Sequence, residues 1–221
     1  TLVSTLIAYV IGIPLGVICF ITDKNGICPG RVIHFVTGIL INLLRSVPFL
    51  ILLVAIIPLT RLIVGTTIGS TATIVPLVVA AAPYVARMVE SSLKEVDAGV
   101  IEAAKSMGSS RLQIIYKVIL PEAKPSLLVG VLISMATILG YSAMAGFVGG
   151  GGLGAIAINY GYNKYNYGVM LAAVVLIVIL VQIIQSVGTH LAVRLDRRVR
   201  TVERKGRLGK ERKKVSKKAW D

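Results

Sequence analysis

The 221-residue sequence has few of the residues from which metal sites, disulfide frameworks and soluble surfaces are built. Its two cysteines and two histidines, at positions 19, 28, 34 and 190, match no metal-ligand spacing and no disulfide framework. We therefore expect inert thiols, no metal and no cofactor. Charged residues make up 15% and hydrophobic residues 55%, and the mean hydropathy is +0.82. These values exclude an ordinary soluble domain and indicate a polytopic membrane protein.

A phosphate-binding loop is also missing, because no Gly-Lys pair is followed by serine or threonine. The run Gly149-x-Gly151-x-x-Gly154 matches a dinucleotide fingerprint only formally, since it follows an apolar helix rather than a strand. We interpret it as a break that ends a membrane helix. The sequence predicts no catalytic residues and no enzyme, and four acids are interpreted as loop or interfacial carboxylates without a paired base: Asp23, Glu90, Glu95 and Asp97.

Long apolar runs dominate the sequence instead. Crossing about 30 Å of hydrocarbon takes roughly 20 helical residues, and five stretches fit this requirement: 2–21, 46–64, 71–89, 126–148 and 167–190. The apolar stretch 31–44 is too short to span and is interpreted as an interfacial or packed helix. Prolines inside apolar stretches predict kinks at Pro58, Pro76 and Pro83. The predicted fold is all-α, with about five transmembrane helices in one domain over 1–195.

The net charge of +14 is distributed unevenly about these spans. Only Arg61 and Lys164 fall on one predicted side, whereas the other lysines and arginines lie after the first span, around the loop 91–122 or in the tail. The positive-inside rule places that loop and the C-terminus in the cytosol and the N-terminal end outside. The basic tail, 196–221, is expected to be disordered and to meet anionic membrane lipid rather than nucleic acid.

The loop 91–122 carries its own helix signals. Asp97 is a good N-cap, and Gly108 sits where a left-handed residue ends a helix. Between them, four apolar residues at i, i+3, i+4 and i+7 predict one apolar face: Val100, Ala103, Ala104 and Met107. The alanines would let a partner surface approach closely. The alternative is an amphipathic helix that lies on the membrane surface.

A second helix is predicted directly after Gly108. Ser110 and Gln113 have the spacing of a capping box. The expected shared face consists of Leu112, Ile115 and Val118, and Pro121 is expected to stop the helix because it forces the preceding residue out of the helical region. The two helices form a short, capped element held outside the membrane.

This loop resembles the cytoplasmic EAA loop of importer permeases that are driven by ATP-binding-cassette (ABC) subunits. The resemblance rests on Glu102-Ala103-Ala104, on Gly108 and on an apolar residue two positions before Leu120-Pro121. The stretches 11–16, 45–49, 57–61, 63–66, 81–90, 140–144 and 151–154 are similar to the permease subunit of methionine importers, so the likeness covers about 1–195.

The resemblance implies a type I ABC importer permease fold in a bacterial cytoplasmic membrane. It further implies an assembly of two identical permeases, two ABC ATPase subunits and an external substrate-binding protein. The loop would couple transport to the ATPase through eight residues: Val100, Glu102, Ala103, Ala104, Met107, Gly108, Leu120 and Pro121.

The fourth apolar stretch is the richest in small and polar residues, and polar groups within hydrocarbon should face protein or a cavity. Small residues also drive helix packing, so a packed interface is an equal alternative for this stretch. We favour Tyr141, Ser142 and Met144 as residues that line a gate at a dimer axis. The flexible thioether of Met144 could plug a narrow opening in one state and yield in another.

The sequence therefore predicts the permease subunit of an ATP-driven importer for L-methionine, with D-methionine as an additional expected cargo. One alternative is an importer of another amino acid or small polar solute. The other is a membrane scaffold or channel that is not coupled to transport, which the loop disfavours because such a protein has no motor to dock.

Overall fold

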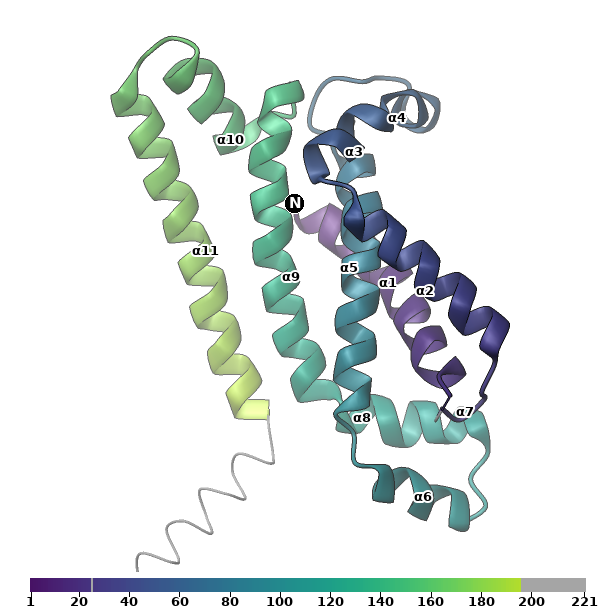
Figure 1. Cartoon of the computed structure of the whole chain (residues 1–221). Coiled ribbons are helices and arrows are strands. Elements are labelled where there is room, and N and C mark those ends of the chain that lie inside the picture. Colours follow the sequence, from purple (N-terminus) through teal and green to yellow (C-terminus); the bar gives the residue numbers. More distant parts are fainter. Residues whose placement is uncertain (25, 196–221) are drawn as a thin grey trace, which may run out of the picture.

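The computed structural model describes residues 1–24 and 26–195, and within that range every regular element is helical (Figure 1). The predicted tail lies outside the described residues. Four helices are long and apolar enough to cross a membrane, and a strongly bent pair could make a fifth span. The all-α polytopic prediction is therefore confirmed.

Helix α1 (Leu2–Thr22) packs along α5 (Ile74–Lys94), and together they fill the core of the domain. The contact is close because α1 offers glycines where the helices cross. A Cβ on Gly12 would lie 2.6 Å from Val85 Cγ1, and one on Gly16 would lie 2.5 Å from the Ala86 carbonyl oxygen. Glycine at such positions lets two membrane helices approach at backbone distance.

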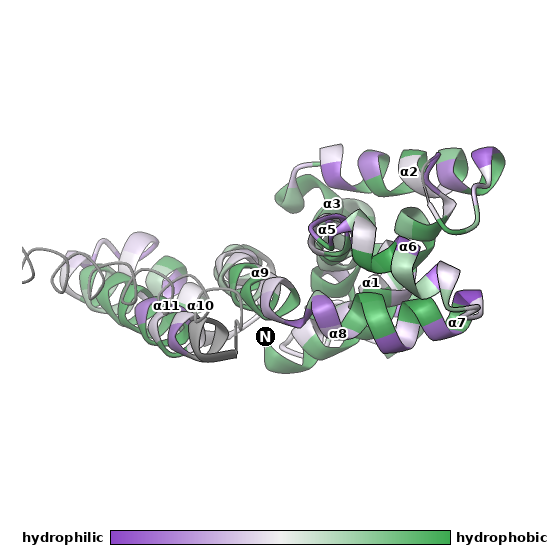
Figure 2. Ribbon diagram, turned by 90° about the horizontal axis from the view of Figure 1, so that it is seen from below, coloured by the Kyte–Doolittle hydropathy of each residue, from purple (hydrophilic) through white to green (hydrophobic). Residues whose placement is uncertain are grey.

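Helix α9 (Lys124–Met144) packs against α5 on one side and α11 (Tyr167–Leu195) on the other. Between α9 and α11 lie the 3-10 turn η2 (Ala145–Val148), α10 (Gly152–Ile156) and the π-helical η3 (Ala157–Tyr162). Figure 2 shows α10 and α11 set apart from the group that contains α1, α2 and α5, with α9 between them. The helices predicted over 2–21, 71–89, 126–148 and 167–190 are thereby confirmed.

The predicted continuous span over 46–64 is wrong. Helix α2 (Arg31–Ser46) is followed by α3 (Phe49–Ala55) at an angle of 101°, and α4 (Ile57–Val64) starts after a second break at Ile56. Proline explains both breaks, because Pro48 is the N-cap of α3 and Pro58 lies in the first turn of α4. The helix expected over 31–44, either interfacial or packed, is α2, and it continues two residues further than predicted.

At the end of the molecule where α5 finishes, the chain forms α6 (Ala98–Ser106), α7 (Arg111–Gln113), the π-helical η1 (Ile114–Ile119) and α8 (Leu120–Glu122). Figure 1 shows these elements at the same end as the connection from α1 to α2. They are short, they run across the end of the long helices, and they lead directly into α9.

Candidate coupling site

Helix α6 is capped at both ends as predicted. The Asp97 carboxylate accepts a hydrogen bond from the Gly99 amide at 2.7 Å, which satisfies one of the free donors of the first turn. Gly108 has φ of +74°, and its amide donates to the Lys105 carbonyl at 3.0 Å. Because only glycine adopts this conformation without strain, the end of α6 is fixed at Gly108.

The residues of the predicted apolar face of α6 do not share one environment, because one is buried and three are exposed. Ala104 is 2% exposed and belongs to the same core cluster as Ile114 and Ile119 of η1, whereas Met107 is 78% exposed. Val100 and Ala103 are also exposed. The exposed side of α6 therefore includes Val100, Ala103 and Met107, while Ala104 packs α6 against its own chain.

Glu102 lies on the exposed side of α6. Its backbone carbonyl accepts a hydrogen bond from the Ser106 hydroxyl at 3.0 Å, so the serine engages the backbone rather than the carboxylate. Within residues 1–24 and 26–195, the ion pairs do not include this side chain. The Glu102 carboxylate is therefore exposed and lies outside these ion pairs.

The capping box that starts the second helix is confirmed. The Ser110 amide donates to Gln113 Oε1 at 2.9 Å, and the Gln113 amide donates to Ser110 Oγ at 3.4 Å. The predicted stop at Pro121 is wrong, because helical structure continues through α8 to Glu122. A regular α-helix would press the proline ring against the carbonyl four residues earlier. The π-helical η1, a wider turn directly before the proline, relieves that clash.

The π turn also changes which residues of this helix are buried. Each π turn adds about one residue relative to an α-helix, so the i, i+3 and i+6 pattern no longer describes one face. Ile114, Ile115 and Ile119 are buried, whereas Leu112 is exposed and Val118 is half-buried. The predicted face is therefore corrected to these three isoleucines. Leu120 is half-buried against the core, and Pro121 is exposed.

An ion-pair network centred on the buried Glu90 carboxylate lies where α5 approaches the loop. Glu90 is 2% exposed and accepts hydrogen bonds from Arg87 Nη1 at 2.6 Å and from Lys94 Nζ at 2.8 Å. Lys94 Nζ also lies 3.0 Å from Asp23 Oδ2, and Arg87 Nη2 donates to Asn42 Oδ1 at 3.2 Å. The network thus joins α5 to α2 and to the end of α1, immediately before α6.

The interpretation of Asp23 and Glu90 as carboxylates without a paired base is wrong. The signal that could have revealed Glu90's partners is the spacing of Arg87, Glu90 and Lys94 at i, i+3 and i+7, which places all three on one helical face. Asp23 comes from a distant part of the sequence, and no local pattern connects it to Lys94. The hydrogen bond from Lys94 holds the pKa of the Asp23 carboxyl below its usual value.

The connection from α1 to α2 also reaches the loop. Arg111 Nη1 of α7 donates to Cys28 Sγ at 3.3 Å, so this connection and the second loop helix touch at one point. Cys19 is buried, and its thiol donates to Thr37 Oγ1 at 3.5 Å. Both thiols are free.

The candidate gate residues lie at the opposite end of α9. The Tyr141 ring stacks on Phe49 of α3, with ring centroids 4.7 Å apart and an interplanar angle of 8°. Ser142 Oγ accepts a hydrogen bond from Thr1 Oγ1 at 3.3 Å, and the Met144 side chain is exposed. Past these residues the chain turns at Gly149, which has φ of +79° and ends η2, so the glycine run forms a helix break.

Other polar residues of α9 pack against neighbouring helices. The Ser134 hydroxyl is fully buried and lies 2.6 Å from the Tyr9 hydroxyl of α1, while it donates to the Gly130 carbonyl at 2.6 Å. Ser126 Oγ donates to Ser92 Oγ of α5 at 3.1 Å. For Ser126 and Ser134, the packing alternative therefore describes the structure.

Comparison with known proteins places this arrangement in a family. The family profile described as "Binding-protein-dependent transport system inner membrane component" matches residues 12–201. The "Probable D-methionine transport system permease protein MetI" of Vibrio cholerae is 54% identical over 192 residues, which cover 87% of this chain and 85% of that protein. The "Methionine import system permease protein MetP" of Bacillus subtilis is 42% identical and covers 81% of each chain.

A solved structure titled "Inward facing conformations of the MetNI methionine ABC transporter" contains a similar chain. It superimposes with a TM-score of 0.87 at 48% sequence identity, covering 88% of this chain and 90% of that one. The fold is therefore that of an ABC importer permease, a multi-pass inner-membrane protein, and the prediction that this chain is the membrane component rather than the ATPase is confirmed. The chain belongs to the family of binding-protein-dependent transport system inner membrane components.

Proposed function

We propose that this chain is the channel-forming permease subunit of an ATP-driven methionine importer. The observation that carries the proposal is the 54% identity to a MetI permease over 87% of this chain, supported by the 0.87 TM-score to a chain of a methionine ABC transporter. The two relatives come from different bacteria, Vibrio cholerae and Bacillus subtilis, and both are named for methionine.

The coupling element supports an ATP-driven mechanism. Helix α6 projects Val100, Ala103, Met107 and the Glu102 carboxylate outward, and we infer that a separate ABC ATPase receives this surface. Ala104 ties the opposite side of α6 to the isoleucines of η1, which continues through α8 into α9. A displacement of α6 would therefore move the base of α9 rather than dissipate within a flexible loop.

The membrane orientation follows from charge. The end that carries α6 has most of the basic residues of the described chain, whereas Arg61 and Lys164 lie toward the other end. By the positive-inside rule, α6 faces the cytosol and Thr1 lies toward the outside.

A second copy of the chain would complete the pathway. Two ATPases would lie on the cytosolic side of the membrane and a substrate-binding protein on the external side. The four or five candidate spans of one chain provide no two-fold axis, whereas a dimer of two chains supplies one. The apolar surface that the chain leaves exposed along α11 supports this assembly, since membrane lipid and a second permease are the surroundings that such a surface tolerates: Leu171, Val175, Ile179, Ile183 and Val187.

We infer that Tyr141, Ser142 and Met144 line the gate of this pathway. All three lie at the end of α9 that is opposite to the coupling loop, next to the glycine-rich break. The Tyr141 ring is held by its stack on Phe49, whereas the Met144 thioether is free to change conformation.

The passage would be mostly apolar and of low affinity. The ion pairs of the described residues lie at the α6 end of α5, so no charge pair near the gate would hold an amino acid's ammonium and carboxylate groups. A thioether side chain suits such a passage. Selection of L-methionine, or of D-methionine, would then fall to the external binding protein.

Uptake of labelled methionine into vesicles tests the proposal. The vesicles should contain this permease, its ATPase and its binding protein, and we expect ATP-dependent accumulation that unlabelled methionine competes away. Transport of another amino acid, with methionine neither carried nor competing, would refute the cargo. No ATP-dependent uptake at all would refute the importer itself.

A further inference from the structure

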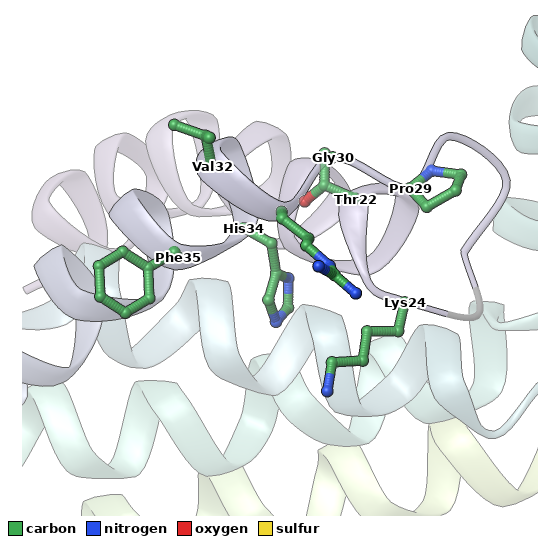
Figure 3. A pocket seen from close by; sticks show the side chains of 8 residues that line it. Thr22, Lys24, Pro29, Gly30, Val32, His34 and Phe35 are labelled. Carbon is green, nitrogen blue, oxygen red and sulfur yellow. The ribbon is translucent and has the colours of Figure 1, made fainter.

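A hollow of about 880 Å³ lies between the end of α1 and the start of α2. Its polar wall carries three basic side chains, Lys24, Arg31 and His34, and its apolar wall includes Val32 and Phe35 (Figure 3). The view shows the Lys24 and His34 side chains extending to the same side of the connection. The hollow thus combines positive charge and apolar surface within one short stretch.

The basic side chains of this hollow form no ion pair with a carboxylate of the described residues. No carboxylate lines the hollow, and the adjacent Asp23 is engaged by Lys94 at 3.0 Å. Neither Lys24 nor Arg31 takes part in an ion pair within residues 1–24 and 26–195. The first turn of α2 holds no acidic residue either, so the partial positive charge of its N-terminus adds to the field.

An apolar stripe on α2 begins at the hollow and runs away from it. Val32 is 75% exposed and Phe35 is 67% exposed. The exposed side chains recur at helical spacing along the length of α2: Val32, Phe35, Val36, Ile39 and Leu43. A ligand that fits both features has an anionic head and a long apolar tail.

We propose that this hollow binds the phosphate of an anionic phospholipid, whose acyl chains lie along the exposed stripe of α2. The proposal rests on the orientation proposed above, because the cytosolic leaflet is the one rich in anionic lipid. Free phosphate shares the head-group chemistry, but it would leave the stripe uncovered. The lipid is therefore the occupant that accounts for both walls.

The test uses the intact permease–ATPase complex in detergent, titrated with dioleoylphosphatidylglycerol and followed by native mass spectrometry. Replacing both cations, Lys24→Gln with Arg31→Gln, should weaken lipid binding. Each basic residue near a lipid surface contributes about 1 kcal/mol, so the expected loss is roughly five-fold per charge. The charge-conserving pair Lys24→Arg and Arg31→Lys should restore binding, which separates loss of the site from misfolding.

A matched control removes the same charge from the same end of the chain. Lys117 and Lys124 lie outside the hollow. The complex with Lys117→Gln and Lys124→Gln should therefore bind phosphatidylglycerol as the unmodified complex does. Equal loss in the control and in the Lys24/Arg31 variant would mean that the complex attracts anionic lipid only through its overall charge, and the site would be refuted. Unchanged binding in the Lys24/Arg31 variant would refute it too.

Two further arms identify the ligand. Phosphatidylcholine should bind the unmodified complex and the Lys24/Arg31 variant equally weakly. Inorganic phosphate should not displace phosphatidylglycerol from the unmodified complex at matched concentration. Phe35→Ser should weaken phosphatidylglycerol binding while it leaves the cations in place. Displacement by phosphate together with an unaffected Phe35→Ser variant would assign the hollow to a free anion. Lipid binding is measured without transport. A failure of methionine uptake would therefore refute the proposed function without changing the outcome of the lipid-binding test.

Discussion

Helices α5 and α11 are both long and apolar, yet their surroundings differ. In the apolar 18-residue stretch of α5, 56% of the residues are buried inside the chain, whereas only 6% are buried in the corresponding stretch of α11. Helix α5 carries alanines in its core and ion pairs at one end, whereas α11 is covered by large aliphatic side chains on nearly every side. The α1–α5 pair is a rigid support built from one chain, and α11 is a surface that needs lipid or another protein.

The same contrast separates the two ends of α9. At its base, the coupling loop is fixed by a cap, a capping box and a core alanine. At its tip, the proposed gate region has a 3-10 turn and glycines with positive φ, and one aromatic stack connects it to α3. In the mechanism proposed above, a movement imposed at the base would be transmitted along α9 to this tip.

The largest expected effect comes from breaking the rigid base. Gly108→Val puts a β-branched residue at φ of +74°, and Glu102→Arg reverses an exposed charge on α6. We expect uptake to fall at least ten-fold while ATP hydrolysis and membrane insertion persist, because these changes act on docking and not on the spans. The measurement is methionine uptake beside ATPase activity in the same vesicles.

Lys105→Gln is the matched control for the coupling loop, since it removes an exposed charge of α6 without changing the cap or the glycine. It should transport within about two-fold of the unmodified complex, as neutral surface changes do. Normal uptake by both Gly108→Val and Glu102→Arg would contradict the docking role of α6.

The second prediction sharpens the account of the rigid support. A Cβ at Gly16 would lie 2.5 Å from the Ala86 carbonyl oxygen, whereas one at Gly38 of α2 would meet nothing within 4 Å. Gly16→Ala should therefore push α1 from α5 and destabilise the protein by about 1–3 kcal/mol. Gly38→Ala should be neutral or stabilising by up to about 1 kcal/mol, because alanine favours helix.

Thermal unfolding of the two glycine variants in detergent measures this difference directly. Equal melting temperatures would show that the α1–α5 contact relaxes freely, and the description of this pair as a rigid support would be wrong.

The third prediction concerns the yielding end. Cys substituted for Met144 should react several-fold faster with an aqueous thiol reagent in one transport state than in another, if the gate opens there. Cys substituted for Ser134 is the comparison, because that position is fully buried against Tyr9 and should be protected in every state. Reaction rates are measured in resting and ATP-trapped vesicles, with Cys28→Ser in both variants so that the native thiol does not contribute. Uniform protection at position 144 would remove Met144 from the pathway.

The smallest effect concerns the ion pair between α1 and α5. The hydrogen bond from Lys94 lowers the pKa of Asp23 in the folded protein, so the carboxylate stabilises the fold above the unfolded pKa of about 4. That contribution is lost as the pH falls through the lower folded pKa. Unmodified protein should exceed Asp23→Asn in stability by less than about 1 kcal/mol at pH 7.

Melting temperatures of the Asp23 variant and the unmodified protein, measured between pH 7 and pH 3, decide this point. The gap should narrow toward the acid end. A gap that is absent at pH 7, or that widens in acid, would show that the Asp23–Lys94 pair does not contribute to stability.

The parts of the fold that were predicted correctly depend on local signals. Asp97, Gly108 and the Ser110–Gln113 box act through the backbone within three residues, so sequence pattern alone locates them. The π turn before Pro121 and the burial of Ala104 depend on how η1 packs beneath α6, which no local pattern encodes. The partnership of Asp23 with Lys94 likewise requires α1 and α5 to lie side by side.

The contact between Arg111 and Cys28 has a practical consequence. It places one native thiol at the joint between the α1–α2 connection and the coupling segment, while the second thiol, Cys19, is buried between helices. A fluorophore or spin label attached to the unmodified chain would therefore report from this joint. Cys28 is thus a native attachment point for a probe at the contact between the α1–α2 connection and the proposed coupling segment.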